Sequence, residues 1–101
     1  MFVPVLKTSA AIASWYGEDH RGKLTASGAP FDPDLYTAAS WHYPFGTKLK
    51  VSHGSRSVLV TVNDRGPAKR LKRDIDLSMA AFRGLALLRR GLLVVKIERV
   101  K

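Results

Sequence analysis

Alternating apolar and polar residues predict β-strands in the middle of this chain. Leu49 and Val51 alternate with lysines over residues 47–52, and three valines alternate with other residues over 57–63. A period of two is typical of a strand with one buried face, and Gly54 between the two runs indicates a turn. The two runs therefore predict a β-hairpin.

Further strands are expected over residues 12–16, 75–77 and 92–100, where apolar residues alternate or run together. Residues 35–40 fit either a short strand or a helical turn. Residues 18–34 are rich in glycine, proline, aspartate, serine and threonine, which predicts a loop with several turns.

A helix is expected over residues 79–90, because Ala81 and Phe82 share one face with later leucines at about 100° per residue. Ser78 stands at the N-cap position, and Gly91 stands where a helix would stop. One late helix among short strands favours a small β-barrel over a sandwich or a βαβ sheet.

The composition indicates one ordinary globular domain with a strong positive charge. The 101 residues include 17 Lys or Arg and 8 Asp or Glu, for a net charge of +9, and 46% are hydrophobic. The length allows a single domain, and no apolar stretch approaches the roughly 20 residues that span a bilayer. The lack of cysteine excludes thiol catalysis, zinc–thiolate sites and a cysteine-linked lipid anchor within these residues.

The charge is concentrated in the second half of the chain. From Lys48 onward fourteen basic residues stand against four acidic ones, and the densest cluster is Lys-Arg-Leu-Lys-Arg at 69–73. Such a distribution favours an anionic partner, which can be a nucleic acid, an acidic lipid or a carboxylate-bearing polymer. A well-solvated surface explains the total charge equally well. A solvated loop, or one that binds carboxylates, explains 69–73 at least as well as a nucleic-acid patch does.

Two aspartates are the strongest candidates for chemistry. Asp64 comes at the end of the predicted hairpin, where side chains often converge on a cleft. Asp76 lies between apolar Ile75 and Leu77, and a carboxyl group with such neighbours is a candidate general acid. The alternative is structural: Asp64 forms a turn, and Asp76 caps the helix that follows.

Aromatic and histidine side chains give weaker signals. Trp15, Tyr16, Trp41 and Tyr43 lie near predicted loops, where flat rings stack on sugars, although core packing explains most aromatics in a small domain. The three histidines are scattered, which favours surface or packing roles over metal ligation. We expect no metal and no cofactor.

Six short segments together resemble the rare lipoprotein A (RlpA) family. They are Ala-Ser-Trp-Tyr-Gly (13–17), Thr-Ala-Ser-Gly (25–28), Thr-Ala-Ala (37–39), Pro-Phe-Gly-Thr (44–47), Asn-Asp-Arg-Gly-Pro (63–67) and Ile-Asp-Leu-Ser (75–78). Each segment alone is weak evidence for the family, but all six in the family's order are a specific match. The resemblance covers about residues 12–100. It implies a mainly β fold, a six-stranded double-psi β-barrel with one short helix between late strands, related to expansins and family-45 endoglucanases.

The resemblance also implies an activity. RlpA-like domains are peptidoglycan lytic transglycosylases, which cleave the MurNAc–GlcNAc bond without water, leave 1,6-anhydro ends and prefer strands without stem peptides. The candidate catalytic residues are Asp76 and Asp64, and the candidate substrate-binding residues are Tyr16, Thr25, Ser27, His42, Arg65 and Trp15. The two aspartates match the family's acids, and Tyr16, Thr25 and Ser27 match positions that line its cleft.

Two positions depart from the family pattern. Ala29 stands where the family usually has glutamate after Thr-Ala-Ser-Gly, and Ser40 stands where it usually has histidine after Thr-Ala-Ala. Both of the missing side chains are candidates for catalytic or substrate-orienting roles. A non-catalytic, expansin-like module that binds cell-wall glycan therefore stays open as the alternative function.

The same reasoning gives expectations about organisation. We expect residues 1–11 to precede the barrel and residues 12–101 to form it, as a monomer without a transmembrane segment. The expected partner is the peptidoglycan glycan strand, with no specific nucleic acid. The family implies the bacterial cell envelope, either periplasmic, secreted or outer-membrane-anchored in a longer form, and residues 1–13 lack the order of an export signal.

Overall fold

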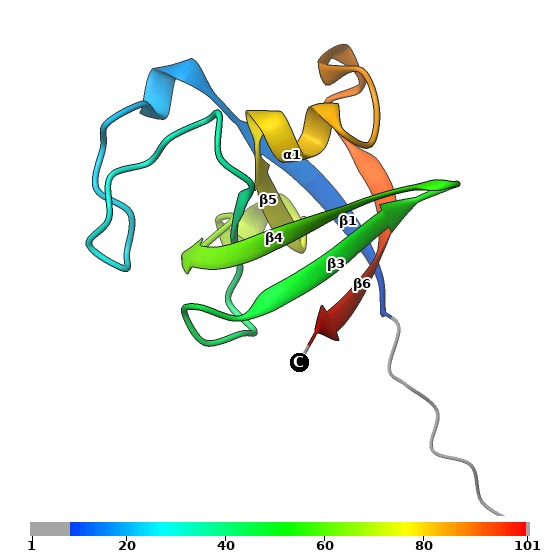
Figure 1. Cartoon of the computed structure of the whole chain (residues 1–101), viewed down its shortest axis with the longest axis horizontal. Coiled ribbons are helices and arrows are strands. Elements are labelled where there is room, and N and C mark those ends of the chain that lie inside the picture. The colour runs from blue at the N-terminus through cyan, green and yellow to red at the C-terminus, as the bar shows by residue number, and fades with distance from the viewer. Residues whose placement is uncertain (1–8, 101) are drawn as a thin grey trace, which may run out of the picture.

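Six strands close into a barrel in the computed structural model, which describes residues 9–100 (Figure 1). The strands are β1 (Ser9–Tyr16), β2 (Thr37–Ala39), β3 (Lys48–His53), β4 (Arg56–Asp64), β5 (Ile75–Ser78) and β6 (Leu93–Val100). Around the barrel the order is β1, β5, β2, β4, β3 and β6. The pairs β1–β5 and β2–β4 are parallel, and the other neighbours are antiparallel.

The predicted fold class, a six-stranded double-psi β-barrel with one short helix, is confirmed. The predicted hairpin is β3–β4, and residues 35–40 contain strand β2 and not a helical turn. Strand β1 begins at Ser9, earlier than the barrel boundary expected at residue 12. Residues 1–8, most of the segment expected to precede the barrel, lie outside the described residues.

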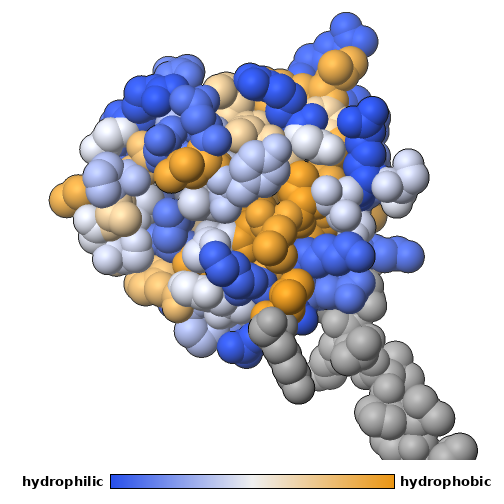
Figure 2. All heavy atoms as spheres, in the orientation of Figure 1, coloured by the Kyte–Doolittle hydropathy of each residue, from blue (hydrophilic) through white to orange (hydrophobic). Residues whose placement is uncertain are grey.

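Alternation along the strands determines which side chains fill the barrel. The largest fully buried side chains include Phe82, Leu49, Ile75, Leu77, Val51, Val60, Val62 and Val95. Burial of one such side chain stabilises the fold by roughly 1.5–3 kcal/mol. Outward positions such as Lys48 and Lys50 are exposed, and Figure 2 shows hydrophilic side chains bordering an apolar area on one face.

The predicted helix over residues 79–90 is wrong in length. Helix α1 covers only Met79–Arg83, and a separate 3-10 helix, η3 (Leu88–Arg90), follows after a turn. Gly84 explains the break, because glycine is a poor helix former and here lies directly against β4. A Cβ atom at Gly84 would lie 2.6 Å from Cγ1 of Val58. The chain thus ends α1 where its backbone must approach the barrel most closely.

The predicted N-cap is confirmed at Ser78. Its hydroxyl oxygen accepts a hydrogen bond from the backbone N–H of Ala81 at 3.3 Å, and the hydroxyl donates to the carbonyl oxygen of Leu35 at 2.5 Å. Ser78 is fully buried. One side chain therefore joins the start of α1 to the segment that leads into β2. No helix among residues 9–100 is long and apolar enough to cross a membrane.

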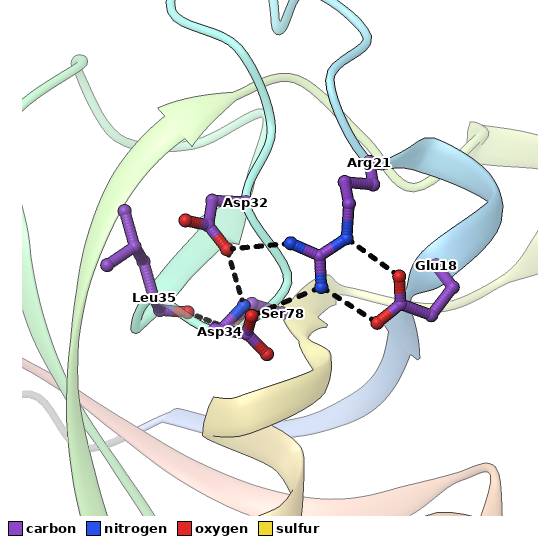
Figure 3. A network of polar contacts seen from close by, with 6 residues as sticks. All are labelled: Glu18, Arg21, Asp32, Asp34, Leu35 and Ser78. Atoms are coloured by element: carbon purple, nitrogen blue, oxygen red, sulfur yellow. Dashed lines mark hydrogen bonds and ion pairs between the residues drawn. The ribbon is translucent and has the colours of Figure 1, made fainter.

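A single arginine organises the long loop between β1 and β2 (Figure 3). Arg21 forms ion pairs with Glu18 at 2.7 Å, Asp34 at 3.1 Å and Asp32 at 3.7 Å. The hydrogen bond from Arg21 lowers the pKa of the Glu18 carboxyl. The loop includes the 3-10 helix η1 (Glu18–His20), and these contacts connect η1 to the far end of the loop near Ser78.

We predict that Gly84→Ala destabilises the protein by about 1–3 kcal/mol, because the added methyl group overpacks the contact between α1 and β4. Urea denaturation of the variant measures the change. The matched control is Val58→Ala, which removes the clashing methyl groups. The double variant should lose less free energy of unfolding than the sum of the losses in the two single variants. A loss equal to that sum would show that Gly84 and Val58 are not coupled.

Candidate active site

The two candidate acids lie in one row that crosses four strands. Asp76 of β5 is paired with Ser14 of β1 on one side and with Ala39 of β2 on the other. Ala39 is in turn paired with Asp64 of β4. Because neighbouring strands lie about 4.8 Å apart, the Cα atoms of Asp64 and Asp76 are roughly 10 Å apart across Ala39. The barrel therefore brings together acids from separate parts of the chain.

A β-bulge controls the direction of Asp64. Ala38 is paired with Val62, but the next residue, Ala39, is paired with Asp64, so Asn63 has no opposite residue on β2. Strict alternation would point Asp64 into the core with Val62. The bulge instead places Asp64 beside Ala39, on the outer face that Asp76 also occupies, since Ala38 and Val62 are the inward residues.

A cleft of about 340 Å³ lies over this row. Its floor and sides come from β1, η1, β2, β5 and the segment that follows β4. The residues lining it are Trp15, Tyr16, His20, Ala39, Asp64, Arg65, Gly66, Pro67, Ala68, Leu71, Arg73 and Asp76. Gly66 has a φ of +154°, a conformation suited to glycine, and lies against Ala39 and Asp76, since a Cβ atom at Gly66 would be 3.5 Å from Cβ of Ala39 and 3.8 Å from Oδ2 of Asp76. The backbone can thus come close to both residues.

Asp64 is held by backbone donors. Its Oδ1 accepts hydrogen bonds from the N–H of Ala26 at 2.8 Å and from the N–H of Arg65 at 2.9 Å. The first of these bonds attaches the 25–29 turn to the end of β4. The carboxylate therefore shapes two loops at the edge of the cleft.

Asp76 is held differently, by a buried hydroxyl. Ser14, only 3% exposed, donates a short hydrogen bond to Oδ1 of Asp76. The second oxygen, Oδ2, lies on the side of Gly66, where a Cβ atom would be 3.8 Å away. Asp76 is half-buried and flanked by the fully buried Ile75 and Leu77. One carboxylate oxygen is thus anchored while the other lies toward the cleft.

Tyr16 provides a neutral hydroxyl beside the acids. Burial raises the pKa of Tyr16, and the negative charges of Asp64 and then Asp76 raise it further. The phenol is therefore protonated throughout the physiological range. Its ring stacks on Phe31 at 4.2 Å, and the ring of His20 meets it edge-on at 5.4 Å. The hydroxyl is buried with no partner within hydrogen-bond distance among the described residues, and the neighbouring Asp64 side chain is the acceptor that raises its pKa further.

Arg65 lines the cleft but directs its guanidinium toward a neighbouring loop. Its Nη1 donates to the carbonyl oxygens of Ser40 at 3.0 Å and Tyr43 at 2.8 Å. The guanidinium also lies 4.0 Å from the centre of the Phe45 ring. These contacts hold the 40–45 loop, and the expected role of Arg65 in binding substrate stays a prediction.

The remaining predicted residues fall around the cleft. Trp15 lines it, and its Nε1 donates to the carbonyl oxygen of Leu88 at 2.9 Å. The hydroxyls of Thr25 and Ser27 form a 2.8 Å hydrogen bond with each other within the 25–29 turn, and neither residue lines the cleft. His42 is exposed, and its backbone N–H donates to the hydroxyl of Ser40. The structure brings together Asp64, Asp76, Tyr16, Trp15 and Arg65, and leaves the other three outside.

The sequence does not indicate two residues that line the cleft. His20 is expected to have a surface or packing role, and Arg73 is expected only as part of the basic 69–73 cluster. Both line the cleft because loops carry them there. No periodic pattern covers these loops, so the available signal was only their position next to recognised motifs.

Comparisons with known proteins agree with this architecture. The lytic transglycolase family model matches residues 8–97. The chain belongs to this family. It is 45% identical over 91 residues to "Probable endolytic peptidoglycan transglycosylase RlpA" of Nostoc sp., covering 86% of this chain and 24% of that protein. It is 40% identical over 98 residues to "Endolytic peptidoglycan transglycosylase RlpA" of Campylobacter jejuni, covering 95% and 35%.

Solved structures extend the comparison of this lytic transglycolase domain. The Streptomyces papain inhibitor has a TM-score of 0.78 at 27% identity and matches 99% of this chain and 100% of its own. An expansin of Clavibacter michiganensis has a TM-score of 0.75 at 24% identity, covering 94% of this chain and 51% of its own, and shows the shared fold alone. The chain spans well under half the length of the RlpA proteins that it matches.

The raised pKa of Tyr16 predicts a loss of stability at alkaline pH. Above about pH 10 the unfolded chain, in which the tyrosine pKa is about 10, releases the phenol proton, whereas the folded protein keeps it. The stabilisation is complete below about pH 10 and is lost as the pH rises above it. Raising the pH from 8 to about 11 should therefore lower the free energy of unfolding of wild type more than that of Tyr16→Phe. Urea denaturation at each pH measures the difference. The exposed Tyr36 gives the control variant Tyr36→Phe, and equal pH dependence of wild type and Tyr16→Phe would refute the prediction.

Proposed function

We propose that this domain is a peptidoglycan lytic transglycosylase that cleaves MurNAc–GlcNAc bonds in peptide-poor glycan strands and leaves 1,6-anhydro ends. The observation that carries the proposal is the row that places Asp76 and Asp64 on either side of Ala39 beneath one cleft. Family membership and the printed names of the RlpA relatives support the same reaction.

Asp76 is the residue we assign to proton transfer. Its Oδ1 is fixed by Ser14, and its Oδ2 lies on the side of Gly66, a residue that lines the same cleft. We assign Oδ2 as the oxygen that reaches the glycosidic oxygen. In the protonated form it donates a proton to the leaving oxygen as the glycosidic bond breaks. The resulting carboxylate then removes the proton from the 6-hydroxyl of the muramic acid, whose oxygen bonds to C1 and closes the anhydro ring.

Asp64 has a complementary role as a fixed negative charge. Two backbone N–H groups hold its Oδ1, so its position does not depend on a flexible partner. The transition state of glycoside cleavage carries positive charge on the sugar ring, which an oriented carboxylate stabilises. The protonated Tyr16 beside it lines the cleft without adding a negative charge to it.

A second candidate function is non-catalytic binding of wall glycan, as in an expansin-like module. Ala29 and Ser40 favour it, because the family's glutamate and histidine are missing at these positions. Ser40 is buried and binds the backbone of the 40–43 loop, which is a structural role. The papain inhibitor with the same fold is a relative whose name describes inhibition rather than glycan cleavage.

The substrate implies the setting. A domain that acts on peptidoglycan works in the bacterial cell envelope, periplasmic, secreted or anchored to the outer membrane in a longer protein. Of the basic 69–73 loop only Leu71 and Arg73 line the cleft, and Lys69 lies instead 5.1 Å from the ring centre of Trp41. The expected partner is the glycan strand and not a specific nucleic acid. Each barrel strand is paired on both sides, which suits a monomer.

The test is release of anhydro-muramyl products from purified peptide-free strands, followed by mass spectrometry. We predict that Asp76→Asn lowers the rate by roughly 100- to 10,000-fold, because proton transfer contributes about that much, and that Asp64→Asn also lowers it strongly. The matched control is Asp74→Asn, since Asp74 is an exposed acid in the same segment whose Oδ2 accepts a hydrogen bond from the N–H of Ile12.

The outcomes separate the two functions. Wild-type protein that binds the strands but releases no anhydro products supports the binding module and contradicts the enzyme. Products that persist in both Asp76→Asn and Asp64→Asn would show that the reaction occurs elsewhere. Circular dichroism of each variant checks that the barrel is intact.

A further inference from the structure

Arg73 differs from the other basic residues of the 69–73 loop. Lys69, Arg70 and Lys72 are exposed, whereas Arg73 is half-buried and lines the cleft beside the two aspartates. Lys72 explains the change of direction, because it takes the left-handed conformation, with φ of +55°, at the end of the 3-10 helix η2 (Lys69–Leu71). The turn at Lys72 sends the next side chain back toward the barrel.

Among residues 9–100 the guanidinium of Arg73 has no hydrogen-bond or ion-pair partner. Its Nε is buried and donates to no acceptor among the described residues, and the ion pairs found among residues 9–100 all involve Arg21. Because Arg73 as a whole is half-buried and lines the cleft, the Nη atoms at the outer end of the guanidinium are the donors that can face a ligand. A buried donor without an acceptor is costly, and a guanidinium cannot relieve that cost by losing its proton. The structure therefore holds an unused positive donor group at the wall of the cleft.

We propose that Arg73 binds the lactyl carboxylate of a muramic acid residue next to the bond that is cleaved. This inference rests on the proposed function. The planar guanidinium matches a carboxylate with two parallel hydrogen bonds, a geometry that a lysine cannot offer. Along an unsubstituted glycan strand the lactyl group is the carboxylate available, and attachment of a stem peptide converts it to an uncharged amide.

Charge balance in the cleft makes this role specific to Arg73. Asp64 and Asp76 would repel an incoming carboxylate, and the exposed Lys69, Arg70 and Lys72 do not line the cleft. Arg73 is the basic lining residue whose hydrogen-bonding capacity the loops do not use, since Arg65 donates to Ser40 and Tyr43. Arg73 is thus a specificity residue that favours strands with free carboxylates.

The experiment compares two forms of the same peptide-free strands, one with free lactyl carboxylates and one with these groups converted to methylamides. Equilibrium binding to each form is measured together with kcat/KM for anhydro-product release. We expect wild type to prefer the carboxylate form by about 10- to 100-fold, the range for hydrogen bonds to charged groups. Arg73→Gln should lose this preference mainly through KM, and Arg73→Lys should recover part of it. Arg70→Gln, which removes one exposed charge from the same loop, should behave as wild type.

The arms separate this inference from the proposed function. A preference that persists in Arg73→Gln, or that wild type lacks, overturns the role of Arg73 even when both forms are cleaved. If wild type cleaves neither form, the proposed function fails, and the binding arm alone decides the inference. If Arg73→Gln does not fold, Arg73→Lys and the methylamide comparison in wild type decide it.

Discussion

The one-residue slip in the pairing of β2 with β4 is the constraint on which the cleft depends. Regular alternation would continue the inward series of Val60 and Val62 and place the Asp64 carboxylate in the barrel core. Burying an unpaired charge there would cost several kcal/mol. With the slip, Asp64 lies beside Ala39 and accepts hydrogen bonds from backbone N–H groups. Stability and the placement of the candidate site therefore favour the same local irregularity.

That placement makes Asp64 a structural residue as well as a proposed functional one. Through its Oδ1 it fixes the 25–29 turn and the start of the segment after β4. The adjacent Arg65 then attaches that segment to the 40–45 loop through the carbonyl oxygens of Ser40 and Tyr43. The turn-forming role expected as an alternative for Asp64 is thus present, and the catalytic role is proposed in addition to it. A loss of activity in Asp64 variants requires a folding control for this reason.

Local patterns predicted what depends on local physics. Alternation gave the β3–β4 hairpin and its buried face, and Ser78 was predictable as an N-cap because its cap bond spans three residues. The helix was predicted too long because periodicity does not register that Gly84 must lie against Val58, far away in the chain. The same limit applies to the site. Motifs named Asp64 and Asp76, but the row, the bulge and the entry of Arg73 and His20 into the cleft arise from tertiary pairing and loop direction.

The charge of the chain acquires a more specific meaning from these contacts. A cleft lined by two aspartates and two arginines would be expected to form ion pairs between them. Here the carboxylates accept hydrogen bonds from neutral donors: backbone N–H groups donate to Asp64, and a serine hydroxyl donates to Asp76. Arg73 consequently keeps its positive charge for an external acceptor. The acids of the first third behave in the opposite way, because Arg21 pairs with three of them. The positive charge that matters for binding is therefore the part that the fold leaves unpaired beside the row of acids.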